Sequence, residues 1–216
     1  MTNVRALVAE FIGTFILVFA GVGSIVAEKS FHGGLGLVGI ALTWGLVVMA
    51  MVYTFGHISG THINPAVTLA FALTKHFPVR KVIPYWIAQI LGAIVASFAV
   101  QYLMGPVGLG VTLPSVPVFP AFLIEIIMTF ILMIVVMAVA TDTRAVGEAA
   151  AIAVGGTVTF LVLFGGPLTG ASLNPARSIG PALVSGNLTS IWIYIFAPLI
   201  GACLAALVYK FVSKQK

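Results

Sequence analysis

The sequence predicts an all-α membrane protein with six transmembrane helices and two half-helices arranged as an inverted repeat. Three observations favour this fold class. First, 61% of the 216 residues are hydrophobic and only 7% are charged, whereas a soluble domain carries about 25% charged residues. Second, six apolar runs are long enough to cross a bilayer as helices. Third, the two halves of the chain share the same motifs in the same order.

The apolar runs define the expected transmembrane helices, each of which needs about 20 apolar residues. Two shorter apolar stretches remain, at about 64–74 and 174–184. At about 1.5 Å per residue, each would form a helix about 15 Å long, so together they match the roughly 30 Å of one bilayer core. The six long runs lie at about 5–27, 37–56, 82–104, 119–141, 147–165 and 190–212.

The basic residues predict the orientation in the membrane. Of the ten Lys and Arg residues, all but Lys29 and Arg177 fall on one side of a six-span topology. Because basic residues concentrate on the cytoplasmic side, we expect both termini in the cytoplasm and the protein in the plasma (inner) membrane. The net charge of +5 therefore reflects orientation and not nucleic-acid binding. The eight basic residues expected on the cytoplasmic side are Arg5, Lys75, Arg80, Lys81, Arg144, Lys210, Lys214 and Lys216.

Three pairs of motifs define an internal repeat. The segment 60–66 (Gly-Thr-His-Ile-Asn-Pro-Ala) recurs as 170–176 (Gly-Ala-Ser-Leu-Asn-Pro-Ala), 110 positions later. Each half contains three spans, so the second half enters the membrane upside down, as in channels and transporters with inverted repeats. We expect one domain over 1–216, with repeats at about 1–104 and 119–216. The other two motif pairs surround Glu10 and Glu125, and Tyr85 and Tyr194.

Asn followed by Pro predicts the start of each half-helix, at Asn64 and Asn174. Asn is a favoured N-cap and Pro is favoured at the first helical position. The residues before each Asn must then be irregular backbone at membrane depth, which is tolerated where it lines a water-filled cavity or is buried in protein. The carbonyls expected to line such a cavity belong to Gly60, Thr61, His62, Gly170, Ala171 and Ser172.

Two half-helices that start from opposite sides would meet near the midplane with their N-termini facing. Each N-terminus carries a partial positive charge, so the pair would repel cations. The Asn amides would donate hydrogen bonds to a passing oxygen, and the carbonyls would accept them. A neutral molecule with hydroxyl groups would find partners there, whereas a hydrated cation would lose its shell.

The doubled Asn-Pro-Ala motif, the second copy followed by Arg177, resembles the aquaporin (major intrinsic protein) family. The resemblance covers essentially the whole chain. It implies an aquaporin-like fold, a homotetramer with one pore per subunit, and passive flux of water or small neutral solutes. The motif residues that would line the pore are Asn64, Pro65, Ala66, Asn174, Pro175 and Ala176.

The resemblance also implies a four-residue selectivity filter on the outer side of the Asn pair, formed by Trp44, Val162, Ala171 and Arg177. Water-selective members usually carry His where Val162 stands, so the opening should be wider and more apolar here. This combination is found in plant nodulin-like members, which are associated with glycerol, urea, ammonia and metalloid hydroxides such as boric and arsenous acid. Ser178 departs from the glycerol facilitators, which usually carry Asp at that position. The chain also lacks the long charged termini of the nodulin-like members, which indicates a prokaryotic relative.

Glu10 and Glu125 are carboxyls inside spans, at equivalent positions of the repeat. The resemblance favours a structural role, in which each carboxylate accepts backbone N–H groups of the loop before a half-helix. A proton relay or an ion site is the functional alternative.

Three other functions stay open. A strictly water-selective channel is the nearest. An inverted-repeat secondary transporter would predict ion-coupled uptake and paired charges at a substrate site, and a cation channel would need an acidic ring. The sequence has no metal-ligand spacing, nucleophile–base constellation or phosphate loop, so we expect no enzyme activity, no cofactor and no metal. The expected partners are the lipid bilayer, water, small neutral solutes and other copies of the chain, and not nucleic acid.

Overall fold

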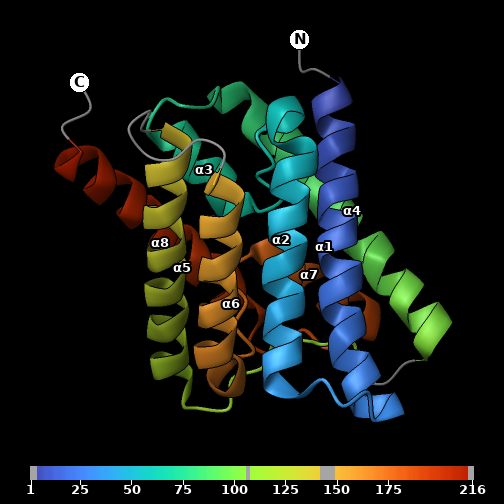
Figure 1. Cartoon of the computed structure of the whole chain (residues 1–216). Helices are drawn as coiled ribbons and strands as arrows, with labels where there is room; N and C mark the ends of the chain where they lie inside the picture. The colour runs from blue at the N-terminus through green and yellow to red at the C-terminus, as the bar shows by residue number, and fades with distance from the viewer. Residues whose placement is uncertain (1–3, 106–107, 142–148, 214–216) are drawn as a thin grey trace.

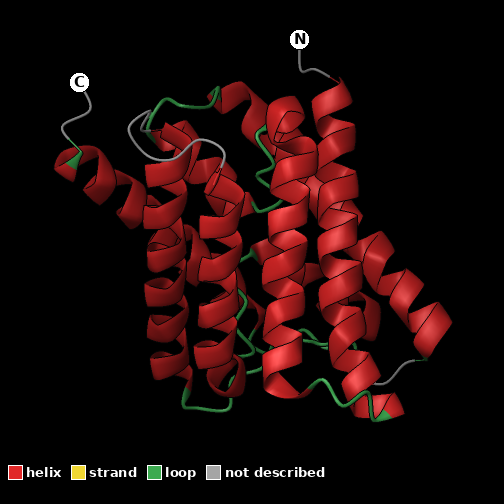
Figure 2. Cartoon of the chain, viewed as in Figure 1, coloured by secondary structure: helices red, strands yellow, loops and turns green. Residues whose placement is uncertain are grey.

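The structure is a computed structural model that describes residues 4–105, 108–141 and 149–213. Within these residues it is helical and contains no strand (Figure 2). Six long helices form a bundle, and two short helices lie inside it (Figure 1). A 3-10 turn, η1 (Val79–Lys81), leads into α4. The helices are α1 (Val4–Phe31), α2 (Gly36–Ser59), α3 (Pro65–Leu73), α4 (Val82–Met104), α5 (Val118–Thr141), α6 (Ala150–Thr169), α7 (Pro175–Ser185) and α8 (Ile191–Val212).

The six long helices correspond to the six predicted spans, and each is long and apolar enough to cross a membrane. The predicted ends of the first and fifth spans are each four residues short, because α1 continues beyond 27 to Phe31 and α6 continues beyond 165 through Pro167 to Thr169. Proline is tolerated in membrane helices where neighbouring groups satisfy the freed carbonyl. The predicted start of the fifth span at 147 lies outside the described residues, as do Arg144, Lys214 and Lys216.

The packing follows the inverted repeat. Helix α1 packs against α4, and its counterpart α5 packs against α8. A Cβ atom added at Gly92 would lie 2.4 Å from the carbonyl oxygen of Phe11, and one at Gly201 would lie 2.3 Å from that of Ile126. These two equivalent glycines therefore let each helix pair cross in backbone contact.

The half-helices connect the two repeats. Helix α3 packs against α8 of the second repeat, and α7 packs against α4 of the first. Residues 61–68 and 171–178, which include the loop before each half-helix, are buried throughout. Loop segments consequently lie inside the bundle as well as at its ends (Figure 2).

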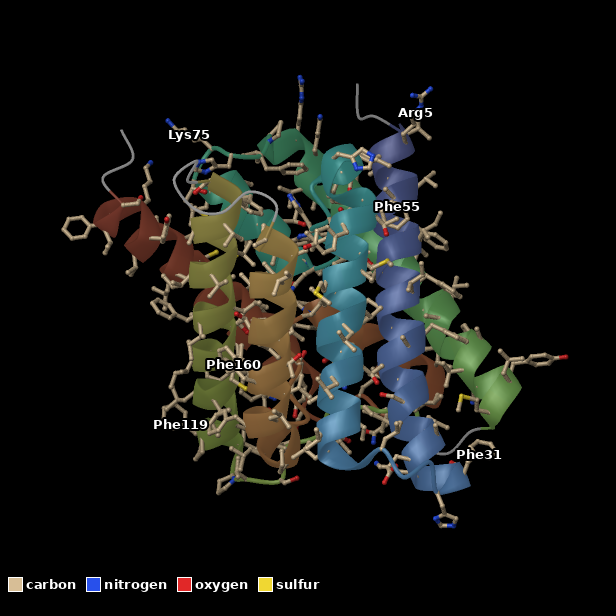
Figure 3. All side chains as sticks on the ribbon, viewed as in Figure 1. Arg5, Phe31, Phe55, Lys75, Phe119 and Phe160 are labelled. Atoms are coloured by element: carbon tan, nitrogen blue, oxygen red, sulfur yellow. The ribbon has the colours of Figure 1, made fainter. Side chains whose placement is uncertain are left out.

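The start of α1 and the end of α8 lie at the same end of the bundle (Figure 1). Arg5 and Lys75 lie at that end, whereas Phe31 and Phe119 lie at the opposite end (Figure 3). An even number of spans returns the chain to the side on which it began, and two of the basic residues that predicted the orientation share this side.

Candidate functional site: a cavity between two facing half-helices

Each half-helix begins at the predicted Asn. The side-chain oxygen of Asn64 accepts a hydrogen bond from the backbone N–H of Ala66 at 2.8 Å, and that of Asn174 accepts one from Ala176 at 3.0 Å. A proline follows each Asn in the first helical position. The N-cap geometry that the two motifs predict is therefore present in both repeats.

The two Asn amides connect the repeats to each other. Asn64 Nδ2 donates to the carbonyl of Leu173 at 2.8 Å, and Asn174 Nδ2 donates to the carbonyl of Ile63 at 2.8 Å. The sequence predicted both amides as donors to a passing molecule. An amide has two N–H donors, so these cross-links leave one donor on each Asn for that purpose.

Glu10 holds the loop before α3. Its Oε1 accepts from the Ser59 hydroxyl at 2.7 Å and from the His62 backbone N–H at 2.9 Å. Its Oε2 accepts from the Ile63 backbone N–H at 2.7 Å and from the Gln89 side chain at 2.8 Å. All four partners donate, which matches a carboxylate that only accepts.

Glu125 holds the loop before α7 in the equivalent way. Its Oε1 accepts from the Thr169 hydroxyl at 2.6 Å and from the Ser172 N–H at 2.9 Å, and its Oε2 accepts from the Leu173 N–H at 3.0 Å. Gln89 has no equivalent here, because the repeat places Pro198 at its position. Both carboxyls are fully buried, and neither is among the described residues that line the cavity.

The two loops have matching, unusual backbone conformations. Gly60 and Gly170 end α2 and α6 with φ values of 85° and 83°. Four non-glycine residues then also adopt positive φ, which costs of order 1–3 kcal/mol each and persists only where the surroundings hold it. The bonds to Glu10 and Glu125 provide that hold. The four residues are Thr61 (46°), Ile63 (42°), Ala171 (44°) and Leu173 (55°).

One cavity of about 130 Å³ runs between the half-helices. Trp44, Val162, Ala171 and Arg177 line one part of it, and the cavity then passes Asn64 and Asn174 and reaches Val139, Ala140 and Ala150. Ala150 and Val162 stand about 18 Å apart along α6 by helical rise. The cavity therefore extends along much of the bundle.

The predicted lining of the cavity needs two corrections. Asn64 and Asn174 line the cavity, but the Pro and Ala that follow each of them are buried and are not among the described lining residues: Pro65, Ala66, Pro175 and Ala176. Gly60, Thr61, His62, Ala171 and Ser172 line the cavity, whereas Gly170 is not among the described residues that do so. Its left-handed conformation ends α6, and a Cβ atom added there would stand 3.3 Å from the Cα atom of Thr112.

The filter residues come from separate elements. Trp44 lies on α2 and Val162 on α6, whereas Ala171 lies in a loop and Arg177 on α7. The guanidinium carbon of Arg177 stands 4.7 Å from the centroid of the Trp44 ring. Its Nη1 donates to the carbonyl of Gly110 at 2.7 Å. Sequence reasoning missed Gly110, because a backbone acceptor in an uncharged loop leaves no signal in the sequence.

Sequence reasoning also missed two tyrosine hydroxyls that hold the residue before each loop. The Tyr85 hydroxyl donates to the Ser59 carbonyl at 3.0 Å, and the Tyr194 hydroxyl donates to the Thr169 carbonyl at 2.7 Å. The tyrosine pair belongs to a motif already used to define the repeat. Extending the 60–66 motif by one residue toward the N-terminus would have found the Ser59 and Thr169 pair as well.

The residue four positions after each Asn makes an equivalent contact. The Thr68 hydroxyl lies 3.1 Å from His62 Nδ1, and the Ser178 hydroxyl lies 2.6 Å from the Ser172 hydroxyl. Thr112 also donates to Ser178 at 2.8 Å. Ser178 therefore links the loop before α5 to the base of α7.

Two half-helices with facing N-termini, held around one cavity inside six spanning helices, define a membrane channel.

A family model described as Major intrinsic protein matches residues 1–209. Nodulin-26 from Glycine max is 51% identical over 210 residues, covering 96% of this chain and 78% of that protein. Aquaporin NIP1-1 from Zea mays is 48% identical over 211 residues, covering 97% and 75%.

A solved structure has the same fold. The aquaglyceroporin from Plasmodium falciparum superposes with a TM-score of 0.86 at 28% identity, covering 97% of this chain and 96% of the other. The chain therefore belongs to the major intrinsic protein (aquaporin) family and resembles its nodulin-like members. It is a multi-pass membrane channel for water and small solutes, from a family of channels and not of enzymes.

Proposed function

We propose that the channel conducts water and small uncharged solutes, among them glycerol, urea, ammonia, and boric or arsenous acid, and excludes ions and protons. The single observation that carries this proposal is the cavity that runs from Trp44 and Val162 past both Asn caps, between two half-helix N-termini. Its wall at position 162 is apolar, where a water-selective member would carry a polar His. The similarity to an aquaglyceroporin and to nodulin-like relatives supports the wider solute range.

Ion exclusion would have two components. The facing N-termini of α3 and α7 bring two partial positive charges to the middle of the cavity. Arg177 adds a full positive charge beside Trp44, and its Nε has no hydrogen-bond partner among the described residues. A solute oxygen could accept from the guanidinium and then from the Asn amides, whereas a cation would lose its hydration shell and meet a positive potential.

The proposal also covers the domain organisation, the oligomeric state and the location of the protein. Residues 1–216 form one channel domain, and the chain works as a homotetramer in the plasma membrane with both termini in the cytoplasm. The chain has no catalytic role. Glu10 and Glu125 have a structural role. Their oxygens accept hydrogen bonds from the loops before the half-helices, and neither residue is among the described residues that line the cavity.

The test is solute flux in liposomes. Purified protein is reconstituted, and vesicle shrinkage and swelling are followed by stopped-flow light scattering with an impermeant osmolyte, glycerol, urea or boric acid outside. We expect fast water flux of low activation energy and fast flux of at least one larger solute. Fast water flux with none of the three solutes would instead support a strictly water-selective channel, and saturable, ion-coupled uptake would support a transporter.

A further inference from the structure

The indole ring of Trp44 lies directly against Gly21 of α1. A Cβ atom added at Gly21 would stand 2.4 Å from each of three successive ring atoms of Trp44, namely Cε2, Cζ2 and Cη2. Equal distances to three atoms of a six-membered ring place the added carbon over the ring face and not at its edge. Non-bonded carbon atoms pack at about 3.5–4.0 Å, so any side chain at this position requires a movement of about 1 Å.

Trp44 also borders the cavity, whereas Gly21 is buried in α1 and is not among the described lining residues. The Arg177 guanidinium packs over the Trp44 ring and is itself fixed to the carbonyl of Gly110. The ring therefore contacts the backbone of α1 at Gly21 and also borders the cavity.

Helix α1 has little freedom to withdraw from Trp44. It crosses α4 in backbone contact, with the carbonyl oxygen of Phe11 only 2.4 Å from a Cβ atom added at Gly92. Val18 and Val22, on either side of Gly21, have no exposed surface. In a core packed this closely, the ring and not the helix is the part that can move.

We propose that Gly21 is a specificity-determining position of this channel, because its missing side chain lets the Trp44 ring sit back against α1 and so sets the width of the filter. This inference rests on the proposed function, in which Trp44 borders the filter. Gly21 does not touch the solute, so it is a positioning residue. Alanine at position 21 moves the ring about 1 Å toward the cavity, which obstructs larger solutes more than water.

The experiment compares wild type, Gly21→Ala and the matched control Gly23→Ala in liposomes. The control adds the same methyl group to the same helix, but the contact it makes is with Met104 Sδ at 4.0 Å. We expect Gly21→Ala to reduce the flux of the largest conducted solute among urea, glycerol and boric acid by about tenfold or more, as about 1.4 kcal/mol of added barrier would. Water flux should fall less, and Gly23→Ala should match wild type. Equal solute flux in the two alanine variants overturns the proposal.

The same substitution in a Trp44→Ala background separates the possible causes. With the ring removed, Gly21→Ala should no longer change solute flux. If the loss persists without the ring, Gly21 does not act through Trp44 and the inference is wrong. If Trp44→Ala by itself leaves the solute range unchanged, the filter proposal fails instead. Should wild type conduct only water, the same comparisons are made on water flux.

Folding failure is also informative. A Gly21→Ala protein that folds only in the Trp44→Ala background supports the ring contact, because removing the ring relieves the overlap. Failure of both proteins to fold shows that Gly21 serves helix packing, and it overturns the inference. Monodispersity in detergent and the melting temperature identify which case holds.

Discussion

Replacing Glu10 with Gln tests whether one buried carboxylate holds the loop before α3. The two oxygens of Glu10 accept four hydrogen bonds, two on each oxygen. An amide keeps only one of these oxygens, and its NH2 group must face the other two donors. Whichever way the amide turns, one of the donors left without an acceptor is a backbone N–H, of His62 on one side or of Ile63 on the other.

The magnitude follows from the number of donors left unpaired. The Ser59 hydroxyl and the Gln89 side-chain oxygen can each accept from the new NH2 group. The donor that stays unpaired is therefore the backbone N–H, at a cost of about 1–3 kcal/mol. For a chain of this length, each 1 kcal/mol shifts the melting temperature by about 2–4 °C. We therefore expect Glu10→Gln to lower the melting temperature by about 2–12 °C, and to reduce water flux because the loop before α3 lines the cavity.

The assay is thermal unfolding of the purified protein in detergent, with Glu28→Gln as the matched control. Glu28 also accepts a backbone N–H, from Leu35 at 2.7 Å, but at an exposed site where water can replace it. The control should therefore shift the melting temperature by less than about 2 °C. Equal melting temperatures for the two variants would refute the reasoning, because they would show that the Glu10 bonds contribute no more than an exposed one.

Three further predictions concern the cavity wall. Val162→His should narrow the filter and reduce larger-solute flux in liposomes while water flux persists; unchanged solute flux would remove Val162 from the constriction. Arg177→Val should raise proton or small-cation conductance, measured with a pH-sensitive dye in vesicles, because it removes the charge above Trp44; an unchanged barrier would assign exclusion to the half-helices alone. Mercurials should inhibit wild type weakly, since Cys203 on α8 is not among the described lining residues, and Ala171→Cys should make water flux sensitive. Strong inhibition of wild type would contradict this placement of Cys203.

The sequence by itself determined the spans, the half-helices and the inverted repeat. These features depend on local properties, namely the length of an apolar run, the N-cap preference of Asn and the position of Pro after it. The equivalence of Glu10 and Glu125 was also visible, because the same four residues, Thr, Phe, Ile and Leu, begin four positions after each of them. The end of α6 was misjudged, because a membrane helix tolerates Pro167 where a soluble helix would end.

Only the tertiary structure decided which groups meet at the site. The Asn64 amide bonds to Leu173, and Arg177 bonds to the carbonyl of Gly110, across 109 and 67 positions of the chain. No local pattern encodes such contacts, because they arise when the half-helix of one repeat packs against the other repeat. The contact between Gly21 and Trp44 belongs to the same class. A glycine in a helix gives no sign of what lies against it until the helices are assembled.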